Sequence, residues 1–377
     1  MEERKLGWMA FGLLLHTHPR FKRCLRPAQT DPVAFLAGSA EDLEKALPLR
    51  SEDARAIFSG TFPAWADKEN RSSERAGVTV VTYEDAEYPE RLRHLSDAPP
   101  FLYVRGQLLP RDAAAVAVVG SRKASPYGLG VAYRLGFDLA EAGFTIVSGL
   151  ARGIDSQAHR GALEAEGRTI GVLGSGIDVV YPKENTRLFA RVASAGALLT
   201  EFPFGSGPRA HHFPVRNRII ASMSAAVIVV EAAKDSGSLI TAMLAADEMG
   251  LPVCAVPGPI TSRTSEGCND LIYDGATPVR GVQDILDVLP RAMREMPGTK
   301  ERGPDGVSGN LFPSPPHNLR GAARQVLEAL SGDAPKSADE LATATGLATG
   351  ILLGHLLELE IKGLAEQLPG GLYIRKP

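Results

Sequence analysis

About a third of the way along the chain, two cations closely follow an apolar run. The run Val116–Val119 is mostly β-branched, and it passes through Gly120 into Ser121, Arg122 and Lys123. A helical pattern follows from about residue 130, which predicts a parallel strand ending in a loop at a helix N-terminus, where backbone N–H groups favour anions. The loop lacks the glycine pattern of dinucleotide sites, and its cation suits an extended polyanion at least as well as a buried pyrophosphate. An ordinary α/β turn with a solvated arginine remains the alternative.

Similar residues follow the next predicted strands. Arg152 lies between two glycines in the run from Ser148 to Asp155, and the segment Phe213–Arg218 adds an aromatic ring and two arginines. From residue 120 to residue 220 the chain has 12 Lys and Arg against 8 Asp and Glu, although its net charge is −3. A protein that binds single-stranded nucleic acid needs cations along the phosphates, N–H groups and hydroxyls that bind oxygens, and an aromatic ring that stacks a base. Each arginine alone is better explained by a structural ion pair, but their expected convergence at one rim favours binding.

These residues are placed by a regular alternation of short apolar runs and helical patterns over residues 112–290. Helices are expected at 130–142, 156–165 and 238–249. The alternation predicts a doubly wound, mostly parallel α/β (Rossmann-like) sheet, whose ligands bind at the carboxyl ends of the strands. Two further strands, at 78–82 and 101–104, are expected to extend its edge. The core strands are predicted at Val116–Val119, Thr145–Ser148, Thr169–Leu173, Ala197–Thr200, Ala226–Val230 and Pro252–Val256.

Two smaller domains are expected on either side of the sheet. Residues 1–77 predict a small all-α domain, with helices near 38–47 and 49–58; its balanced charge favours packing or partner docking over DNA binding. The α/β domain spans 78–290, and the Pro- and Gly-rich stretch 291–320 is interpreted as a flexible linker. Residues 321–377 predict three helices and a hairpin, a winged helix, with a capping box at Ser337. Its acids and bases are nearly balanced, which favours protein contact over DNA reading.

The composition narrows the class of protein. A net charge of −3 and a pI near 6.3 exclude a uniformly basic nucleic-acid coat but allow a local basic patch. The three cysteines form no metal or disulfide pattern, and no apolar run approaches the roughly 20 residues of a membrane span. The sequence therefore predicts a soluble, cytoplasmic protein without a membrane span. No Walker A or GxSxG motif occurs, and the adjacent His211 and His212 lack zinc-ligand spacing, so no metal, cofactor or catalytic residue is expected.

Taken together, the strings at the predicted strand ends resemble the DNA-processing protein A family (DprA, also called Smf). They occur in the family's order across nearly the whole α/β domain, and the flanking layout, a helical module like a sterile-alpha-motif domain in front and a winged helix behind, also fits. The strings are Val-Gly-Ser-Arg122, Ser148-Gly-Leu-Ala-Arg-Gly-Ile-Asp155, Phe213-Pro-Val-Arg-Asn-Arg218, Val-Val-Glu231, Ser236-Gly-Ser-Leu-Ile-Thr-Ala242 and Val256-Pro-Gly258.

The resemblance implies a non-enzymatic protein that binds and protects incoming single-stranded DNA during natural transformation and loads the RecA recombinase onto it. It also implies a homodimer formed through the α/β domain. Arg209 is the expected counterpart of a basic residue that precedes Phe213 in relatives. The nucleic-acid-binding residues that the resemblance implies are Ser121, Arg122, Gly149, Arg152, Arg209, Phe213, Arg216, Asn217 and Arg218. The pattern at the strand ends adds Lys123 and Ser238 to this expected set.

Two alternatives stay open at this point. One is an enzyme, a nucleotide phosphoribohydrolase on a similar sheet. Such enzymes resemble this chain in a glycine-rich loop, but the corresponding stretch from Ser236 to Ala242 lacks their closing glutamate. The other alternative is an interaction scaffold with an inert α/β domain, against which the arginine-rich strand ends argue.

Overall fold

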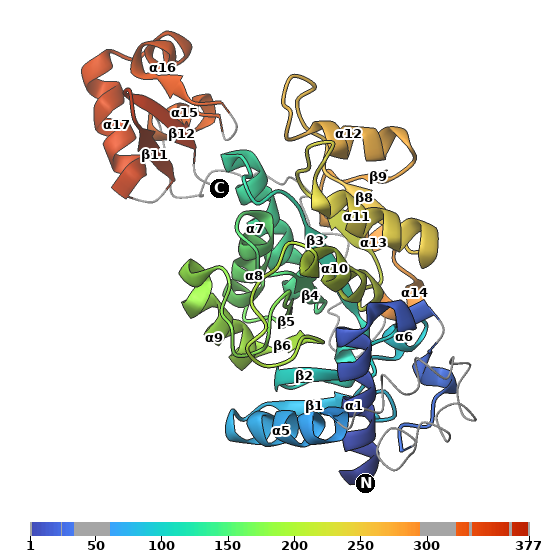
Figure 1. Ribbon diagram of the computed structural model, residues 1–377. Coiled ribbons are helices and arrows are strands. Elements are labelled where there is room, and N and C mark those ends of the chain that lie inside the picture. The colour runs from blue at the N-terminus through green and yellow to red at the C-terminus, as the bar shows by residue number, and fades with distance from the viewer. Residues whose placement is uncertain are drawn as a thin grey trace.

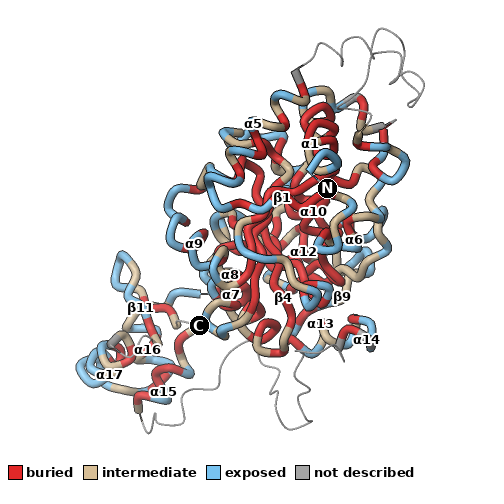
Figure 2. The backbone as a smooth tube through the Cα atoms, turned by 90° about the horizontal axis from the view of Figure 1, so that it is seen from below, coloured by how far each residue is buried: buried red, intermediate tan, exposed pale blue. Residues whose placement is uncertain are grey.

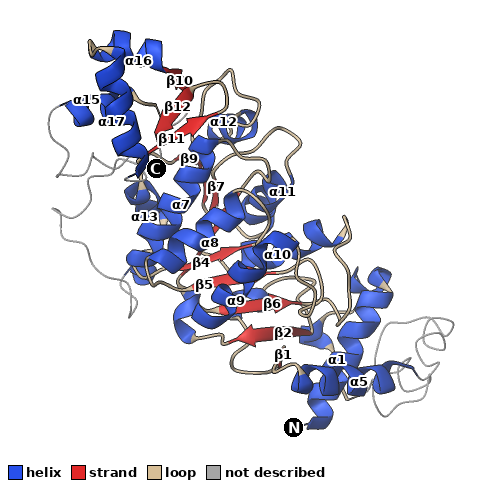
Figure 3. Ribbon diagram, turned by 90° about the vertical axis from the view of Figure 1, so that its left-hand side faces the viewer, coloured by secondary structure: helices blue, strands red, loops and turns tan. Residues whose placement is uncertain are grey.

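The computed structural model describes residues 2–23, 25–33, 61–294, 322–331, 334–361 and 364–375. Within these ranges the main feature is a nine-stranded sheet in the order β1-β2-β6-β5-β4-β3-β7-β8-β9 (Figures 1 and 3). Strand β2 runs antiparallel to both β1 and β6, and the remaining pairs are parallel. The strands are Thr79–Thr82 (β1), Phe101–Gly106 (β2), Ala115–Val119 (β3), Thr145–Ser148 (β4), Thr169–Val172 (β5), Ala197–Thr200 (β6), Val227–Val229 (β7), Val253–Ala255 (β8) and Thr277–Pro278 (β9).

This arrangement confirms the predicted fold class. The six predicted core strands coincide with β3 to β8 within one or two residues, and β1 and β2 form the expected edge addition. Helix α7 begins at Pro126, four residues before the predicted start, because the Ser125 hydroxyl accepts the N–H of Gly128 and proline suits the first helical turn. The helix predicted at 238–249 is α11 (Gly237–Met243) followed by a π-helical turn, η5 (Leu244–Glu248).

Helices cover both faces of the sheet, so the central strands are buried on both sides (Figure 2). Along β3, Val116 and Val118 face one hydrophobic core while Ala115 and Ala117 face the other, as the alternation of a strand requires. The helices of the α/β region are α6 (Glu90–Arg93), α7 (Pro126–Glu141), α8 (Ile154–Glu164), α9 (Thr186–Ala195), α10 (His212–Ser222), α11, α12 (Glu266–Tyr273), α13 (Val282–Val288) and α14 (Arg291–Arg294), with short 3-10 turns η3 (Pro110–Ala113) and η4 (Lys183–Asn185).

The N-terminal helices share a hydrophobic core with the sheet. Helix α1 (Glu2–Thr17) and α5 (Thr61–Arg75) pack on each other, and Trp8 and Phe11 belong to the same buried cluster as Phe101 and Tyr103 of β2. The predicted boundary at residue 77 therefore does not separate two cores. The turns η1 (Pro19–Arg23) and η2 (Pro27–Gln29) follow α1, and the helices predicted at 38–47 and 49–58 lie outside the described residues.

The C-terminal region has a core of its own and the predicted winged-helix elements. Ser337 and Glu340 form the expected capping box at the start of α16. Its elements are α15 (Ala322–Ala329), β10 (Lys336–Ser337), α16 (Ala338–Thr345), α17 (Thr349–Ile361), β11 (Ala365–Leu368) and β12 (Leu372–Arg375). In the described part of the chain no single helix has the length and apolar content of a membrane span, and the one helix pair that reaches them together is bent by 106°.

Candidate nucleic-acid interface

A pocket of about 800 Å³ lies at the topological switch point of the sheet. Strands β3 and β7 are neighbours, but the chain leaves β3 toward β4 on one side and returns later to β7 on the other. The loops that follow these strands therefore diverge and leave a crevice at their carboxyl ends, which is where open α/β sheets bind ligands. We call it the switch-point pocket. Its lining includes Ser121, Arg122, Lys123, Ala151, Asp155, Tyr181, Pro208, Ala210, Phe213, Arg216, Asn217, Ser236, Ser238, Thr241 and Thr264.

Three cations line this pocket. Arg122 and Lys123 are exposed in the loop after β3, and the Arg122 guanidinium lies 4.5 Å from the centre of the Phe213 ring. Arg216, on α10, is only 3% exposed. Its Nη1 donates to the carbonyl oxygen of Gly149 at 2.8 Å and to that of Val172. Burial lowers the pKa of Arg216 to about 10, so it remains a cation at neutral pH. Among the described residues, none of the three has a carboxylate within ion-pair distance.

The carboxylate of the described lining, Asp155, is engaged with the backbone. Its Oδ2 accepts the N–H groups of Gly149 at 3.2 Å and of Ala151 at 3.3 Å. Burial raises the pKa of Asp155, while the positive charge of Arg216 partly opposes this effect. The side chain thus fixes the loop between β4 and α8, on which Arg216 rests, and the pocket keeps an excess of positive charge.

The buried Glu231, two residues after β7, holds the Arg122 loop in place. Its carboxylate accepts from Ser125 N at 2.8 Å, from Ser125 Oγ at 2.7 Å and from Thr264 Oγ1 at 3.0 Å. A Cβ on Gly128 would lie 2.3 Å from its Oε2, so a larger residue at this position would displace the carboxylate. The carboxylate therefore stabilises the start of α7 rather than pairing with the pocket arginines.

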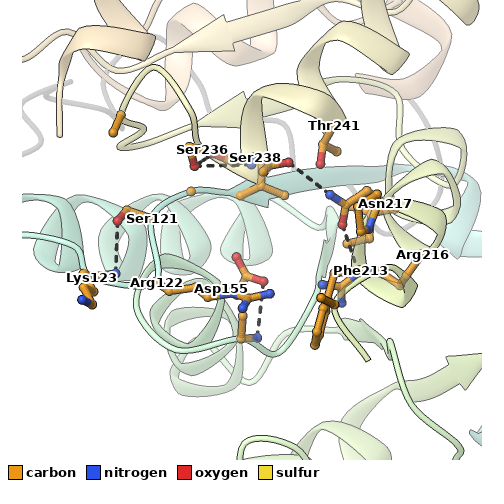
Figure 4. Close-up of a pocket in the computed structure, with 18 of the residues that line it drawn as sticks. Ser121, Arg122, Lys123, Asp155, Phe213, Arg216, Asn217, Ser236, Ser238 and Thr241 are labelled. Carbon is orange, nitrogen blue, oxygen red and sulfur yellow. Dashed lines mark hydrogen bonds between the residues drawn. The ribbon is translucent and has the colours of Figure 1, made fainter. Parts of the chain in front are cut away.

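Ser236, Ser238 and Thr241 lie across the pocket from Arg122 and Phe213, and Asn217 lies between the two sides, next to Arg216 (Figure 4). Asn217 is held at both ends of its amide, since Oδ1 accepts from Arg216 Nε at 3.1 Å and Nδ2 donates to the Gly237 carbonyl oxygen at 3.2 Å. The hydroxyls of Ser236 and Ser238 lie 2.8 Å apart. One side thus offers charge and an aromatic ring, and the other, together with Asn217, offers hydroxyl and amide groups that bind oxygen or base edges.

The structure brings most of the predicted site residues together. Gly149 lies beneath Arg216, and a Cβ there would come within 2.3 Å of Nη1. Arg152 lies beside the pocket and donates to Glu184. Arg209 is exposed between Pro208 and Ala210, which both line the pocket. The predicted residues that line it directly are Ser121, Arg122, Lys123, Phe213, Arg216, Asn217 and Ser238.

The expectation that Arg218 shares this rim is wrong. Arg218 is buried and pairs with Glu201 at 2.7 Å and Asp97 at 3.1 Å. Residues 216 and 218 are separated by about 200° around a helix, so they must point to opposite sides of α10. Helical periodicity applied to this segment could have separated them.

Sequence reasoning missed several lining residues, among them Tyr181, Thr241 and Thr264. Tyr181 follows the third predicted core strand, Thr169–Leu173, and this position after a strand end could have marked it as a lining residue. Nothing in the local sequence around Thr264 indicates that the segment after β8 returns to the pocket.

The fold and the pocket define the class, a doubly wound α/β protein with a cationic, aromatic-lined site at its switch point. Family models for DNA recombination-mediator protein A and for the DprA winged helix domain match residues 79–290 and 312–371, and the chain belongs to this DprA/Smf family of DNA processing proteins.

Individual relatives agree with this assignment. The chain is 36% identical over 319 residues to Protein Smf of Synechocystis, covering 78% of this chain and 80% of the relative. It is 40% identical over 303 residues to Protein Smf of Escherichia coli, covering 80% and 78%. The solved structure of DNA processing protein A from Streptococcus pneumoniae superposes with a TM-score of 0.60 at 34% identity, covering 77% of this chain and 96% of that one. A solved structure of DNA processing protein A from Helicobacter pylori has a TM-score of 0.50 at 30% identity and covers 55% of this chain and 94% of that one. That structure was reported for the single-stranded DNA binding mode of the Helicobacter pylori protein.

Proposed function

We propose that this chain is a non-enzymatic single-stranded DNA-binding protein that protects incoming DNA and loads the RecA recombinase onto it in natural transformation and recombination. The observation that carries the proposal is the cation set of the switch-point pocket. Arg216 is buried without a carboxylate within ion-pair distance in the described chain, and Arg122 and Lys123 stand beside it. A buried cation is costly unless an anion completes its surroundings, and a DNA phosphate supplies that charge.

The pocket chemistry favours single strands over duplexes. Phe213 is partly exposed with a cation over its ring, an arrangement that suits a base freed from pairing. The single-stranded DNA binding mode described for the Helicobacter pylori relative supports the same ligand.

The enzyme alternative is disfavoured by the same geometry. A nucleotide hydrolase needs a carboxyl group free for proton transfer, whereas Asp155, the carboxylate of the described lining, accepts two backbone N–H groups. Release of free base from AMP by the purified protein would favour the enzyme.

Fluorescence anisotropy of a labelled oligothymidine, titrated with salt and competed with duplex, tests the proposal. A site that neutralises three or four phosphates should give a log–log salt slope of about −2 to −3. Arg122→Glu should weaken binding by about tenfold or more, while Arg191→Glu, an exposed charge reversal on α9 that does not line the pocket, should leave it nearly unchanged. Equal affinity of the Arg122 variant and wild type would overturn the proposal.

The remaining parts of the proposal have separate tests. Light scattering measures the homodimer that we expect through the α/β domain. A strand-exchange assay with RecA and DNA coated by single-strand-binding protein measures loading, which the Arg122→Glu variant should lose together with DNA binding.

A further inference from the structure

A second aromatic ring borders the switch-point pocket. Tyr181 lies in the connection between β5 and α9, is 38% exposed, and has its ring centre 5.9 Å from that of Phe213. The Phe213 ring already has the Arg122 guanidinium 4.5 Å from its centre. Tyr181 therefore offers solvent-exposed aromatic surface next to a ring that is already partly covered.

The segment that carries Tyr181 is fastened to the loop that carries Arg152. Asn185, 3% exposed, donates from Nδ2 to the Leu150 carbonyl oxygen at 3.0 Å and to Ser156 Oγ at 2.8 Å. The two connections, one after β4 and one after β5, thus form a single surface beside the pocket. The segment that carries Tyr181 and the loop that carries Arg152 are therefore held together before any ligand binds.

The two cations on this surface differ in how freely they can bind a phosphate. Lys183 is exposed, and no carboxylate lies within ion-pair distance of it in the described ranges. The Arg152 side chain is 61% exposed, but its Nε donates to the carboxylate of Glu184, which is 51% exposed. The surface therefore holds one aromatic ring, one available cation and one cation occupied by a solvent-exposed acid.

We propose that Tyr181, Lys183 and Arg152 form a second nucleotide subsite at the edge of the switch-point pocket, which Tyr181 also lines, and that Tyr181 stacks the base next to the bound one while Glu184 competes with a DNA phosphate for Arg152. This inference rests on the proposed function and extends it. Stacking on an aromatic ring tolerates every base, so the subsite adds affinity and length dependence rather than sequence preference. An exposed ion pair is weak, so a phosphate can displace Glu184.

The stacking part is tested with Tyr181→Leu and Tyr181→Phe in the full-length protein. Loss of one stacked base should weaken oligothymidine binding by about five- to a hundredfold in Tyr181→Leu, whereas Tyr181→Phe keeps the ring and should bind like wild type. Tyr133→Leu, at a half-buried tyrosine in the middle of α7 and outside the pocket lining, is the matched control. An oligothymidine with one 2-aminopurine should be quenched on binding to wild type and not to Tyr181→Leu.

The competition part is tested at physiological salt with Glu184→Gln, which should tighten binding by about two- to fivefold. Glu164→Gln removes the same charge nine residues beyond Asp155 along α8, about 14 Å away, which exceeds the Debye length of about 8 Å at physiological salt. It should change nothing. In an Arg152→Ala background the effect of Glu184→Gln should vanish.

The outcomes separate the two proposals. Failure of wild type to bind oligothymidine would refute the proposed function itself. Normal wild-type binding with an unchanged Tyr181→Leu affinity and unchanged 2-aminopurine quenching would refute the second subsite alone. A Glu184→Gln gain that persists without Arg152 would refute the competition.

Discussion

Replacing Arg218 by methionine should destabilise the fold without removing the DNA site. Arg218 and Glu201 are both nearly buried, with side chains 8% and 11% exposed, and their atoms approach to 2.7 Å. Burial alone would raise the pKa of Glu201, but Arg218 and Lys22 more than offset it, so the net shift is downward. Loss of the arginine leaves the carboxylate with Lys22, at 3.4 Å, as its ion-pair partner in the described chain. Breaking a buried pair in this way costs about 3 kcal/mol or more.

Thermal unfolding followed by circular dichroism measures this cost. For a domain of this size about 3 kcal/mol corresponds to a fall in Tm of roughly 6–12 °C. The double variant Arg218→Met with Glu201→Leu should recover much of it, because the two charges that then lose a partner, Lys22 and Asp97, are only partly buried, with side chains 22% and 34% exposed. Arg122→Met, at an exposed position, should shift unfolding by less than about 0.5 kcal/mol while it weakens DNA binding. An Arg218→Met protein as stable as wild type but unable to bind DNA would contradict the separation of the two arginines.

Three further changes should have defined effects. His159 is fully buried, and its Nδ1 donates to Thr169 Oγ1, which in turn donates to the Ile146 carbonyl oxygen. Burial lowers the pKa of His159 to about 3. Below pH 6.5 the unfolded state therefore binds a proton that the folded state does not, and stability should fall by up to about 1.4 kcal/mol per pH unit between pH 6.5 and 3, measured by urea unfolding; His159→Gln should remove that slope. Burial raises the pKa of the Cys254 and Cys268 thiols to about 12, so a Cys24→Ser variant should not react with a thiol reagent at pH 8 until denaturant is added; rapid native reaction would show these thiols to be accessible. Gly149→Ala should displace Arg216 and weaken oligothymidine binding in anisotropy, because the added Cβ lies 2.3 Å from Nη1; full affinity would mean that the position of Arg216 does not matter.

The sequence determined the fold class because short β-branched runs alternating with helical patterns have few other solutions. Strands β3 to β8 were predicted within two residues, and the capping box at Ser337 marked the second helix of the winged helix. Local chemistry predicts these features, since apolar periodicity, caps and turns involve residues near in sequence. The strand-end rule also indicated where a ligand site would lie.

The tertiary structure decided what each strand-end residue does. Arg216 and Arg218 look equivalent in the sequence, yet one lines the pocket and the other pairs with Glu201. The sequence places Glu231 at a strand end, where a carboxylate caps a helix or pairs with an arginine, and only the structure shows that it holds Ser125 and Thr264, which lie 106 and 33 residues away in sequence.

The same applies to the N-terminal region and to Tyr181. The sequence predicts a separate helical domain over 1–77, whereas Trp8 and Phe11 share a core with β2. Tyr181 comes next to Phe213 only because β5 and α10 meet at the same end of the sheet. Local pattern fixes the elements, but contacts between residues distant in the chain depend on how those elements pack, which no local window contains.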